Sequence, residues 1–318
     1  MTETLGSAGL AGAIALLGLA TVAGFSSVWL LALLGHFRRH VAAFALILAL
    51  LALLATWPPA LKVAMCAAAL AICALNMISM RRAMPISPSG ARDGVMLRVV
   101  FANVLDSSEE FGPLVEWVRS EKADILLACE VTPRGVSALR ALEPQLPFGH
   151  GLRRGEVMIL SRLPLAESQV DPSLSFVRLA SAAIATPAGP VQLVVAHPPA
   201  PRDRAQAVTN ARTIAATGSV AGKAQGGVIV AGDFNSTPWN PAFRAMVARA
   251  GLAFGPGALK PTWPTWLPAW LGLPLDHILV GGGCTIVERR HGPNTGSDHR
   301  PILADIRVPV APGESPRR

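Results

Sequence analysis

Long apolar runs without a single charged side chain fill most of the first 80 residues, and they restrict the folds open to this chain. Residues 5–34, 41–57 and 63–80 contain no Asp, Glu, Lys or Arg. A helix needs about 20 apolar residues to cross a bilayer, with about 17 as the lower limit. A cleaved signal peptide fits poorly, because no basic residue precedes the first run and that run is too long. The pattern predicts a multi-pass region of about three transmembrane helices at residues 1–83, in an inner or plasma membrane.

The basic residues around these runs bear on orientation. Arg38 and Arg39 follow the first run and Arg81 and Arg82 end the third, whereas only Lys62 lies between the second and the third. Loops rich in Lys and Arg stay on the cytoplasmic side of a membrane. The count weakly favours a cytoplasmic location for everything after the third run. Because so few charges decide it, the side of the membrane stays open.

The overall basicity of the chain invites a nucleic-acid interpretation, so its source matters. The isoelectric point is about 10.3, and the net charge is +8. Residues 1–91 hold five of the 28 basic and one of the 20 acidic residues, which leaves 23 basic and 19 acidic residues in 92–318. A net charge of +4 over that segment is a mild field, which solvated surface charge explains as well as a polyanion site does.

After the apolar region, the composition changes to that of a globular domain. Residues 84–95 form a short linker that contains the Pro/Ser/Gly-rich stretch 84–94, and 311–318 has the composition of a frayed tail. Between them, short strand-like runs separated by turn signals alternate with a few helical patterns. This predicts an α/β catalytic domain at 96–310, a four-layer αββα sandwich of two packed mixed sheets flanked by helices. The strand-like runs are 96–103, 124–130, 156–163, 178–186, 191–197, 227–235, 276–282, 284–290 and 300–308.

Polar side chains recur at the ends of these runs. One such end, AGDFNSTPWN at 231–240, could by itself be a turn, because Asx residues often turn the chain. There are six such ends in all. A turn at each would need its own explanation, whereas one polar cleft shared by the strand ends explains all six. The residues are Asn103, Glu130, His197, Asp233 with Asn235, Asp276 with His277, and Ser297 with Asp298 and His299.

The residue types in this set indicate a chemistry. Several acids and amides supply the hard oxygen ligands that suit Mg²⁺ or Mn²⁺. The absence of Cys from the set argues against a zinc site, and no G-x-S-x-G motif offers an acyl-transfer nucleophile. A divalent cation, a His near a carboxylate and amide donors together suit the attack of water on a phosphate ester.

The ordered motifs resemble those of the endonuclease/exonuclease/phosphatase superfamily, which includes deoxyribonuclease I-like nucleases. GDFN or SDH alone would be weak evidence, but the full set occurs in the family's order over roughly residues 96–308. The three apolar runs ahead of it resemble the membrane-anchored bacterial members. The matching stretches are RVVFANV, DILLACEV, MILSRLPL, LVVAHPP, IVAGDFNSTP, PTW at 261–263, LDHILV and SDHRPI.

The resemblance implies a metal site that holds Mg²⁺ or Mn²⁺. Glu130 would bind the cation, helped by Asn103 and Asp298. Many relatives have a second Asn after the first motif, whereas this chain has Asp106, which is either an extra ligand or a turn residue. Thr262 in the PTW stretch would be a supporting hydrogen-bonding residue.

The resemblance also implies the catalytic residues. Asp233 and Asn235 would position the attacking water and the scissile phosphate. His299 would act as a base or phosphate ligand and be oriented by Asp276, while His197 would stabilise the phosphate. Which acid takes the proton of the water is left open.

Three features depart from the family pattern. The chain has no Tyr, although nuclease members use a Tyr near the phosphate. Glu156 stands where relatives have a small residue, and near a phosphate it would repel, so we expect it to point away. Trp263, Trp266 and Trp270 lie at spacings of three and four residues. They could pack against the domain, contact a membrane interface or stack on a base or substrate.

Together these observations predict a membrane-anchored, divalent-metal-dependent phosphoester hydrolase, either a phosphodiesterase, a phosphatase or a nuclease. Its substrate would be a lipid headgroup, a small phosphodiester or a nucleic acid, and no protein partner is predictable. The alternative is a non-catalytic membrane protein whose domain binds a phosphorylated ligand or a partner. Transport is poorly supported, because the apolar runs contain no acid or base to form an ion path.

Overall fold

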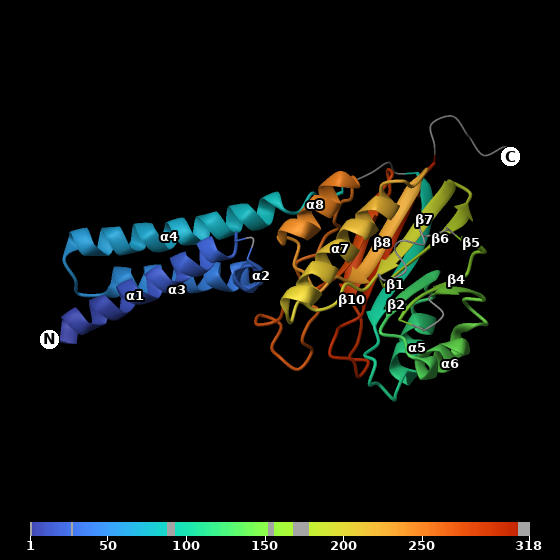
Figure 1. Cartoon of the computed structure of the whole chain (residues 1–318), viewed down its shortest axis with the longest axis horizontal. Coiled ribbons are helices and arrows are strands. Elements are labelled where there is room, and N and C mark those ends of the chain that lie inside the picture. The colour runs from blue at the N-terminus through green and yellow to red at the C-terminus, as the bar shows by residue number, and fades with distance from the viewer. Residues whose placement is uncertain (1, 27, 88–92, 152–155, 168–177, 311–318) are drawn as a thin grey trace. The chain divides into compact units, whose positions relative to one another are not determined.

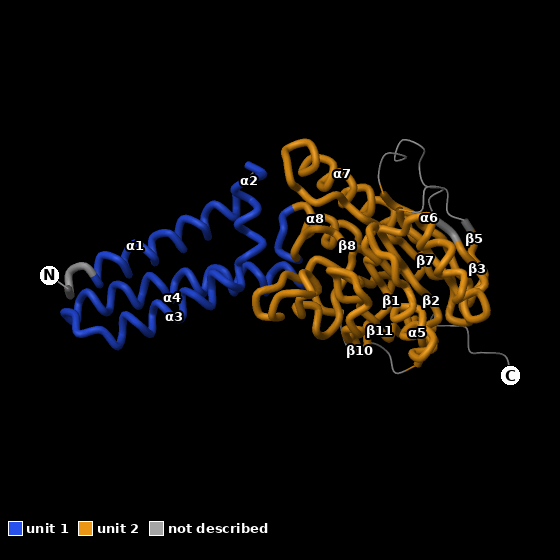
Figure 2. The backbone as a smooth tube through the Cα atoms, turned by 90° about the horizontal axis from the view of Figure 1, so that it is seen from below, with its two compact units in different colours: residues 1–84, 238–241 blue, residues 85–237, 242–318 orange. Residues whose placement is uncertain are grey.

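The computed structural model divides the chain into two units (Figure 2). The first contains residues 1–84 and 238–241, and the second contains 85–237 and 242–318. The predicted tail at 311–318 and residues 88–92 of the predicted linker lie outside the described residues. The structure describes residues 2–26, 28–87, 93–151, 156–167 and 178–310.

The first unit contains three helical segments that are long and apolar enough to cross a membrane. This is the number that the sequence predicts. The segments cover Gly6–Ala23, Trp29–Leu54 and Pro59–Arg82. They are formed by α1 (Thr2–Ala23), α2 (Trp29–Ala32), η1 (Leu33–Phe37), α3 (Arg38–Leu54) and α4 (Pro59–Arg82).

The first helix is shorter than the uncharged run that predicted it. It ends at Ala23, and Arg38 and Arg39, which follow the first uncharged run in the sequence, lie at the start of α3. The uncharged run 5–34 is therefore divided among α1, α2 and η1 rather than forming one helix. Gly24 and Gly35 approach so closely that a Cβ atom on Gly24 would lie 2.8 Å from the Cα atom of Gly35. Glycine at both positions permits this close approach. The chain turns at residues 24–25, and Arg38 belongs to a helix rather than to a loop, which weakens the charge count for orientation.

An amide links the three helices of this unit. Asn76 of α4 donates from Nδ2 to Thr21 Oγ1 of α1 at 2.9 Å. Its Oδ1 accepts from Arg38 NH1, at the start of α3, at 3.2 Å. All three residues are buried. In apolar surroundings such bonds hold helices together, because an unpaired amide there is costly.

The second unit contains two mixed β-sheets. Pairing runs β10-β11-β1-β2-β4-β3 in the six-stranded sheet and β5-β6-β7-β8-β9 in the five-stranded sheet. Strands β3 and β5, which are short, are absent from the sequence prediction. The strands are β1 (Gly94–Asn103), β2 (Ile125–Cys129), β3 (Phe148–Gly151), β4 (Val157–Ser161), β5 (Leu165–Glu167), β6 (Leu179–Thr186), β7 (Gly189–Ala196), β8 (Gly227–Asp233), β9 (Asp276–Gly281), β10 (Thr285–His291) and β11 (Ile302–Pro309).

The sheets are built on the same plan, which brings the polar strand ends together. Within the described strands, β1 with β2 and β7 with β8 are the parallel pairs, and their neighbours are antiparallel. The carboxyl ends of each parallel pair therefore meet the amino ends of the strands beside them. Asp233 at the end of β8 is paired with Asp276 at the start of β9. Likewise, Phe101 near the end of β1 is paired with Ile302 at the start of β11.

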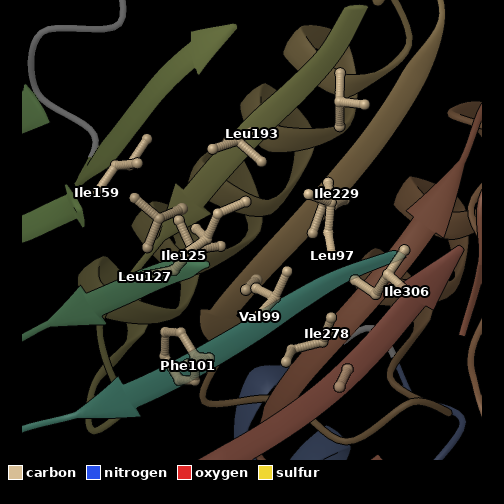
Figure 3. Packing of buried hydrophobic residues seen from close by; sticks show 14 of the residues in the cluster. Leu97, Val99, Phe101, Ile125, Leu127, Ile159, Leu193, Ile229, Ile278 and Ile306 are labelled. Carbon is tan, nitrogen blue, oxygen red and sulfur yellow. The ribbon is translucent and has the colours of Figure 1, made fainter. Parts of the chain in front are cut away.

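Alternation along the strands supplies the core. Leu97, Val99 and Phe101 of β1 face the other sheet and contact residues such as Ile229 and Ile278 within one buried cluster (Figure 3). Successive strand residues point to opposite faces. The intervening residues of β1 therefore face outward, toward the helices that cover this sheet. Because both faces are apolar, the strands are continuous hydrophobic runs rather than alternating ones.

Helices cover the outer faces and complete the layers. Leu114 and Val118 of α5 (Gly112–Ser120) and Leu139 of α6 (Pro133–Leu139) pack on the outward residues of the six-stranded sheet, with Leu142 of η2 (Arg140–Leu142) beside them. Helix α7 (Arg204–Ala221) contacts β7 and β8 of the other sheet (Figure 1). Phe243 of α8 (Pro241–Arg249) packs on Phe234, with ring centroids 4.9 Å apart. The predicted αββα order is confirmed.

Candidate functional site

The polar strand ends converge at one edge of the sandwich. Asn103 ends β1, Glu130 follows β2, His197 follows β7 and Asp233 ends β8. Asp276 opens β9, and His299 lies shortly before β11. Hydrogen bonds and ion pairs connect all six residues, although they come from both sheets. Convergence follows from the shared topology, because each parallel pair delivers its carboxyl ends to this edge.

Asn103 connects the two sheets at the site. Its Nδ2 donates to Glu130 Oε1 at 2.9 Å and to Asp233 Oδ2 at 3.1 Å. Its Oδ1 accepts from the backbone N–H of Leu105 at 3.0 Å, which fixes the amide in this orientation. One neutral side chain therefore holds two carboxylates close together.

A chain of buried titratable groups runs from Asp276 through His299 to Asp233. His299 Nδ1 lies 2.8 Å from Asp276 Oδ2, and its Nε2 lies 3.5 Å from Asp233 Oδ2. Because a carboxylate can only accept, the Nδ1 atom of His299 carries a hydrogen. Burial opposes charge on His299, but Asp276 and Asp233 together raise its pKa to about 10. Burial raises the pKa of Asp233 to about 7.

The segment that contains Thr262 supports this chain. Thr262 Oγ1 accepts from the backbone N–H groups of Leu275 and Asp276, both at 3.1 Å. Trp263 Nε1 donates to Asp298 Oδ2 at 3.0 Å. Thr262 therefore fixes the start of β9, which carries Asp276, the residue whose carboxylate orients His299.

His197 faces the same carboxylates from the five-stranded sheet. Its Nε2 lies 3.4 Å from Glu130 Oε1 and 3.8 Å from Asp233 Oδ2. On its other side, Nδ1 lies 3.4 Å from NH1 of Arg178. A guanidinium can only donate, so Nδ1 is the acceptor and the hydrogen of the neutral ring is on Nε2. Burial, followed by the charge of Arg178, lowers the pKa of His197 to about 3.

Arg178 is a site neighbour that the sequence prediction did not include, and its partner is Glu156, which we expected to point away from a phosphate. Arg178 Nε forms a salt bridge of 2.8 Å with Glu156 Oε2. The register explains their position, because Leu179 is paired with Ala196 and Val157 with Cys129. The residue before each of these strands therefore lies beside the catalytic end of its neighbour. Nothing in the local sequence marks Arg178, since a charged residue before a strand is common.

Asn235 and Asn210 hold the loop after β8. The backbone N–H of Asn235 donates to Asp233 Oδ1 at 2.8 Å, and its Nδ2 donates to Pro198 O at 3.0 Å. Asn210 of α7 donates from Nδ2 to Pro199 O and Phe234 O, both at 3.0 Å. These bonds join the loops after β7 and β8. Asn210 gave no sequence signal beyond being a polar residue in a helix.

Several polar residues near the motifs lie outside this cluster. His277 is buried behind it, with Nε2 3.0 Å from Ser236 O and its ring against Phe243. Burial lowers the pKa of His277 to about 4, so the ring is neutral. Asp106 lies in a turn, and its backbone N–H, rather than its carboxylate, contacts Glu130 Oε2 at 3.1 Å.

Unusual backbone conformations gather at the same edge. Leu105, Glu130 and Asn235 have φ angles of 62°, 58° and 47°. Asn tolerates this left-handed region, whereas Leu and Glu adopt it at a cost. Such strain persists where the surrounding structure enforces it and is typical of functional sites. For Glu130, the turn redirects the chain directly after β2.

The donor set can accommodate a cation. In the described part of the chain, two groups bring possible ligand atoms within 4.8 Å of one another: Glu130, His197 and Asp233, and Asp233, Asp276 and His299. Asp276 Oδ1 is buried and has no hydrogen-bond partner among the described residues. Crowded carboxylate oxygens of this kind fit a hard divalent cation. Neither group includes Asp298, whose carboxylate bonds to Trp263.

Comparison with known proteins agrees with this geometry. The endonuclease/exonuclease/phosphatase family model matches residues 100–299. An endonuclease/exonuclease/phosphatase from Beutenbergia cavernae DSM 12333 is 14% identical with a TM-score of 0.55, covering 67% of this chain and 72% of that chain. Humanized D. rerio TDP2 is 18% identical with a TM-score of 0.56, covering 67% and 99%. A D. rerio TDP2 complexed with single-strand DNA product has a TM-score of 0.54 at 16% identity, covering 67% and 99%. The curated proteins contain no match.

Proposed function

The chain belongs to the endonuclease/exonuclease/phosphatase family, and we propose that it is a membrane-anchored, divalent-metal-dependent hydrolase of phosphoester bonds. The observation that supports this most is the buried chain from Asp276 through His299 to Asp233. Buried acids beside a histidine are costly to a fold, and they occur where their charge serves chemistry. A purely binding domain would not need the acid that orients His299.

The acids at the strand ends fit a magnesium or manganese ion. The motifs assign it to Glu130, helped by Asn103 and Asp298. The geometry supports Glu130 with Asp233 beside it. By contrast, Asn103 presents its Nδ2 donor to both carboxylates, and the Asp298 carboxylate bonds to Trp263. His197 belongs to the group of possible ligands, but its Nε2 hydrogen makes it a donor instead. When bound, a divalent cation neutralises the charge of a phosphate ester and lowers the pKa of the carboxylates around it.

We assign the positioning and deprotonation of the attacking water to Asp233 and His299. Asp233 is fully buried and accepts from Asn103 and from the backbone of Asn235, so its carboxylate is held in one orientation. Burial raises the pKa of Asp233 to about 7 in the metal-free chain. A cation bound beside it would lower that pKa, so the carboxylate would be ionised and able to take a proton near neutral pH. His299, held by Asp276, donates from Nε2 toward negative charge.

His197 and Asn235 stabilise the phosphate. The hydrogen on His197 Nε2 points toward the carboxylate cluster, where an equatorial phosphate oxygen would receive it. Asn235 places its amide beside Asp233. Fixed donors that face developing negative charge are a main source of catalysis. Arg178 acts through His197 as a positioning residue, because it fixes the tautomer that donates.

The substrate is a phosphoester, and its class is the part of the proposal that experiment must decide. A lipid headgroup or a small phosphodiester fits a chain with three helices able to cross a membrane. Nucleic acid belongs in the same panel, because a similar structure is of a TDP2 with a single-strand DNA product. The alternative, a non-catalytic domain that binds a phosphorylated ligand, would retain binding without turnover.

The test is hydrolysis of bis-(p-nitrophenyl) phosphate by the full-length chain in lipid nanodiscs. We expect turnover with Mg²⁺ or Mn²⁺, its loss in EDTA and its loss in Glu130→Gln. Glu109→Gln is the matched control, because Glu109 is an exposed acid paired with Arg134. A folded protein that binds Mg²⁺ but hydrolyses no phosphoester in a panel of lipids, inositol phosphates and nucleic acids would support the binding alternative.

A further inference from the structure

A tryptophan-bearing loop lies next to the catalytic segment, and the proposed chemistry does not use it. We call residues 264–271 the Trp loop. Its base is closed by Trp263 and Leu273, whose backbones exchange hydrogen bonds of 3.1 Å and 2.6 Å. The loop therefore projects from a fixed pair of residues rather than from a flexible connection.

The Trp loop is attached to the segment that carries His299. The backbone N–H of Thr265 donates to Asp298 O at 2.9 Å, and Thr265 Oγ1 donates to Ser297 O at 3.0 Å. Trp263 Nε1 donates to the Asp298 carboxylate, and the ring of Trp263 lies 6.4 Å from that of His299. These bonds fix the position of the Trp loop relative to the segment that carries His299.

The tip of the Trp loop exposes large aromatic surfaces. Trp266 is 71% exposed and Trp270 is 67% exposed. Internal bonds keep the tip ordered, since the N–H of Leu271 donates to Pro268 O at 2.9 Å. Two exposed tryptophans on an ordered loop are costly in water and indicate an interaction surface.

We propose that the Trp loop docks into the headgroup region of a lipid bilayer, with Trp266 and Trp270 as its anchors. Tryptophan is enriched at membrane interfaces, because its ring is apolar and its N–H is polar. The stretch 261–275 contains no charged residue. It therefore lacks the cations that nucleic acids and acidic partners require, but it suits an interface that buries aromatic surface.

The helical unit of the same chain supplies the attachment to a bilayer that this proposal requires. Its first unit holds three helices long and apolar enough to cross a membrane, and only residues 83–93 connect the last of them to β1. A domain on so short a connection stays near lipid, where even a weak interfacial contact is populated. The docking surface goes beyond the proposed chemistry and does not depend on it.

The experiment measures the distance of the Trp loop from lipid directly. A single cysteine replaces Ala269 and is labelled with the fluorophore NBD. The background is the full-length chain with Cys66→Ala, because the other three native cysteines are buried. The protein is placed in nanodiscs of phosphatidylcholine and phosphatidylglycerol that contain doxyl-labelled lipid. We expect blue-shifted emission and stronger quenching by a doxyl group near the headgroup than by one near the chain end.

Ala185→Cys is the matched control. Ala185 is an exposed alanine near the end of β6, and the register places that end of the strand away from the catalytic edge. The second comparison is Trp266→Ser with Trp270→Ser in the Ala269→Cys protein, with folding checked by circular dichroism. We expect the loss of most of the quenching, because both replaced side chains are the anchors.

Each result decides the proposal. Equal quenching at residues 269 and 185 would overturn it, and so would quenching that both serine substitutions leave unchanged, since the short connection alone would then bring the loop near lipid. A blue shift without doxyl quenching would also overturn it, by showing that protein covers the loop. None of these readouts depends on turnover, so failure here would leave the proposed hydrolase activity untouched.

Discussion

Each of the two units (Figure 2) contains a buried polar cluster among its described residues. The two clusters differ in charge. In the helical unit, Asn76 receives a bond from Arg38 and gives one to Thr21, so one amide joins three helices. In the α/β unit, three buried or partly buried carboxylates meet two histidines. The first cluster contains one charged side chain, that of Arg38, whereas the second contains five titratable side chains.

The difference teaches which cluster serves the fold and which serves chemistry. Bonds made by Asn76 connect three apolar helices, so they stabilise packing. In the α/β unit, burial raises the pKa of Asp233 to about 7, which means that ionising it is unfavourable. A site that holds its groups in unfavourable states trades stability for function. Four substitutions and one change of pH test this comparison, from the largest expected effect to the smallest.

Asp233→Asn should have the largest effect, and on activity alone. The amide keeps the shape of the side chain but cannot take a proton from water, so we expect kcat/KM for bis-(p-nitrophenyl) phosphate to fall about 10³-fold. Stability should stay equal or rise, because a buried carboxylate is removed. Enzyme assays and thermal unfolding of the same preparation measure both. A large fall in melting temperature, with residual activity, would show that Asp233 serves the fold.

Acid should destabilise the α/β unit through a buried histidine outside the site. The pKa of His277 is lowered by burial from 6.5 to about 4. The unfolded chain therefore binds a proton first, and the stability contributed above pH 6.5 is lost as the pH falls toward 4. Complete loss would amount to about 3 kcal/mol. The free energy of unfolding in urea, measured between about pH 7 and pH 5, checks this.

His277→Gln should flatten that dependence, whatever its effect on stability near neutral pH. Gln cannot titrate, so the slope that His277 contributes disappears. An unchanged slope in His277→Gln would assign the acid sensitivity to other groups, of which the partly buried His291, with a pKa lowered to about 4, is the first to examine. This result sharpens the comparison, because it separates structural from catalytic histidines within one unit.

Arg178→Gln should reduce kcat by about 10- to 100-fold, less than the loss of a catalytic group. Without the guanidinium, His197 Nδ1 loses its donor and the ring can adopt the other tautomer. Removal of the positive charge should also raise the pKa of His197, so the acidic limb of the pH–rate profile should move upward. A fall in kcat with an unshifted profile would reduce Arg178 to a structural role. Arg178→Lys should restore the positive charge beside His197 but not the geometry of the guanidinium bond to His197 Nδ1.

Asn76→Leu should have the smallest effect and should leave activity unchanged. Interhelical polar bonds in a membrane contribute about 0.6 kcal/mol each, and up to about 1.7 kcal/mol. We expect a loss of about 1 kcal/mol in the unfolding free energy of the helical unit, measured in mixed micelles. Met77→Leu, on an exposed position of the same helix, is the control. Equal stability of both variants would show that the amide is not a structural link.

Much of the site could be predicted because strand ends are visible in a sequence. Glu130, Asp233 and His299 each follow or precede an apolar run, and the residue types themselves indicated a hard cation and a phosphate. Helices were harder to delimit. Helix α5 begins at Gly112 with Pro in its first turn, and no side-chain hydrogen bond caps it. Strand β5 is too short to produce a pattern of its own.

Contacts between distant residues could not be predicted. Glu156 precedes a strand of one sheet and Arg178 precedes a strand of the other, and the two form a salt bridge. Arg178 in turn sets the tautomer of His197. The left-handed backbone at Glu130 likewise depends on how the chain leaves β2, since Glu has no preference for it. The bond from Trp263 to Asp298 also joins segments far apart in the chain. These features are imposed by packing.

By itself, the sequence determined the presence of three apolar helices, the alternation of apolar strands with polar ends, and the family to which those ends belong. These properties are local, because the absence of charge and the periodicity of apolar residues act within one segment. The tertiary structure alone decided where the first helix ends, which carboxylates each site histidine faces, and which residues tune its pKa and tautomer. The physical reason is that protonation, tautomer and backbone strain depend on burial and on neighbours from other strands. Only the pairing of the two sheets brings those neighbours together.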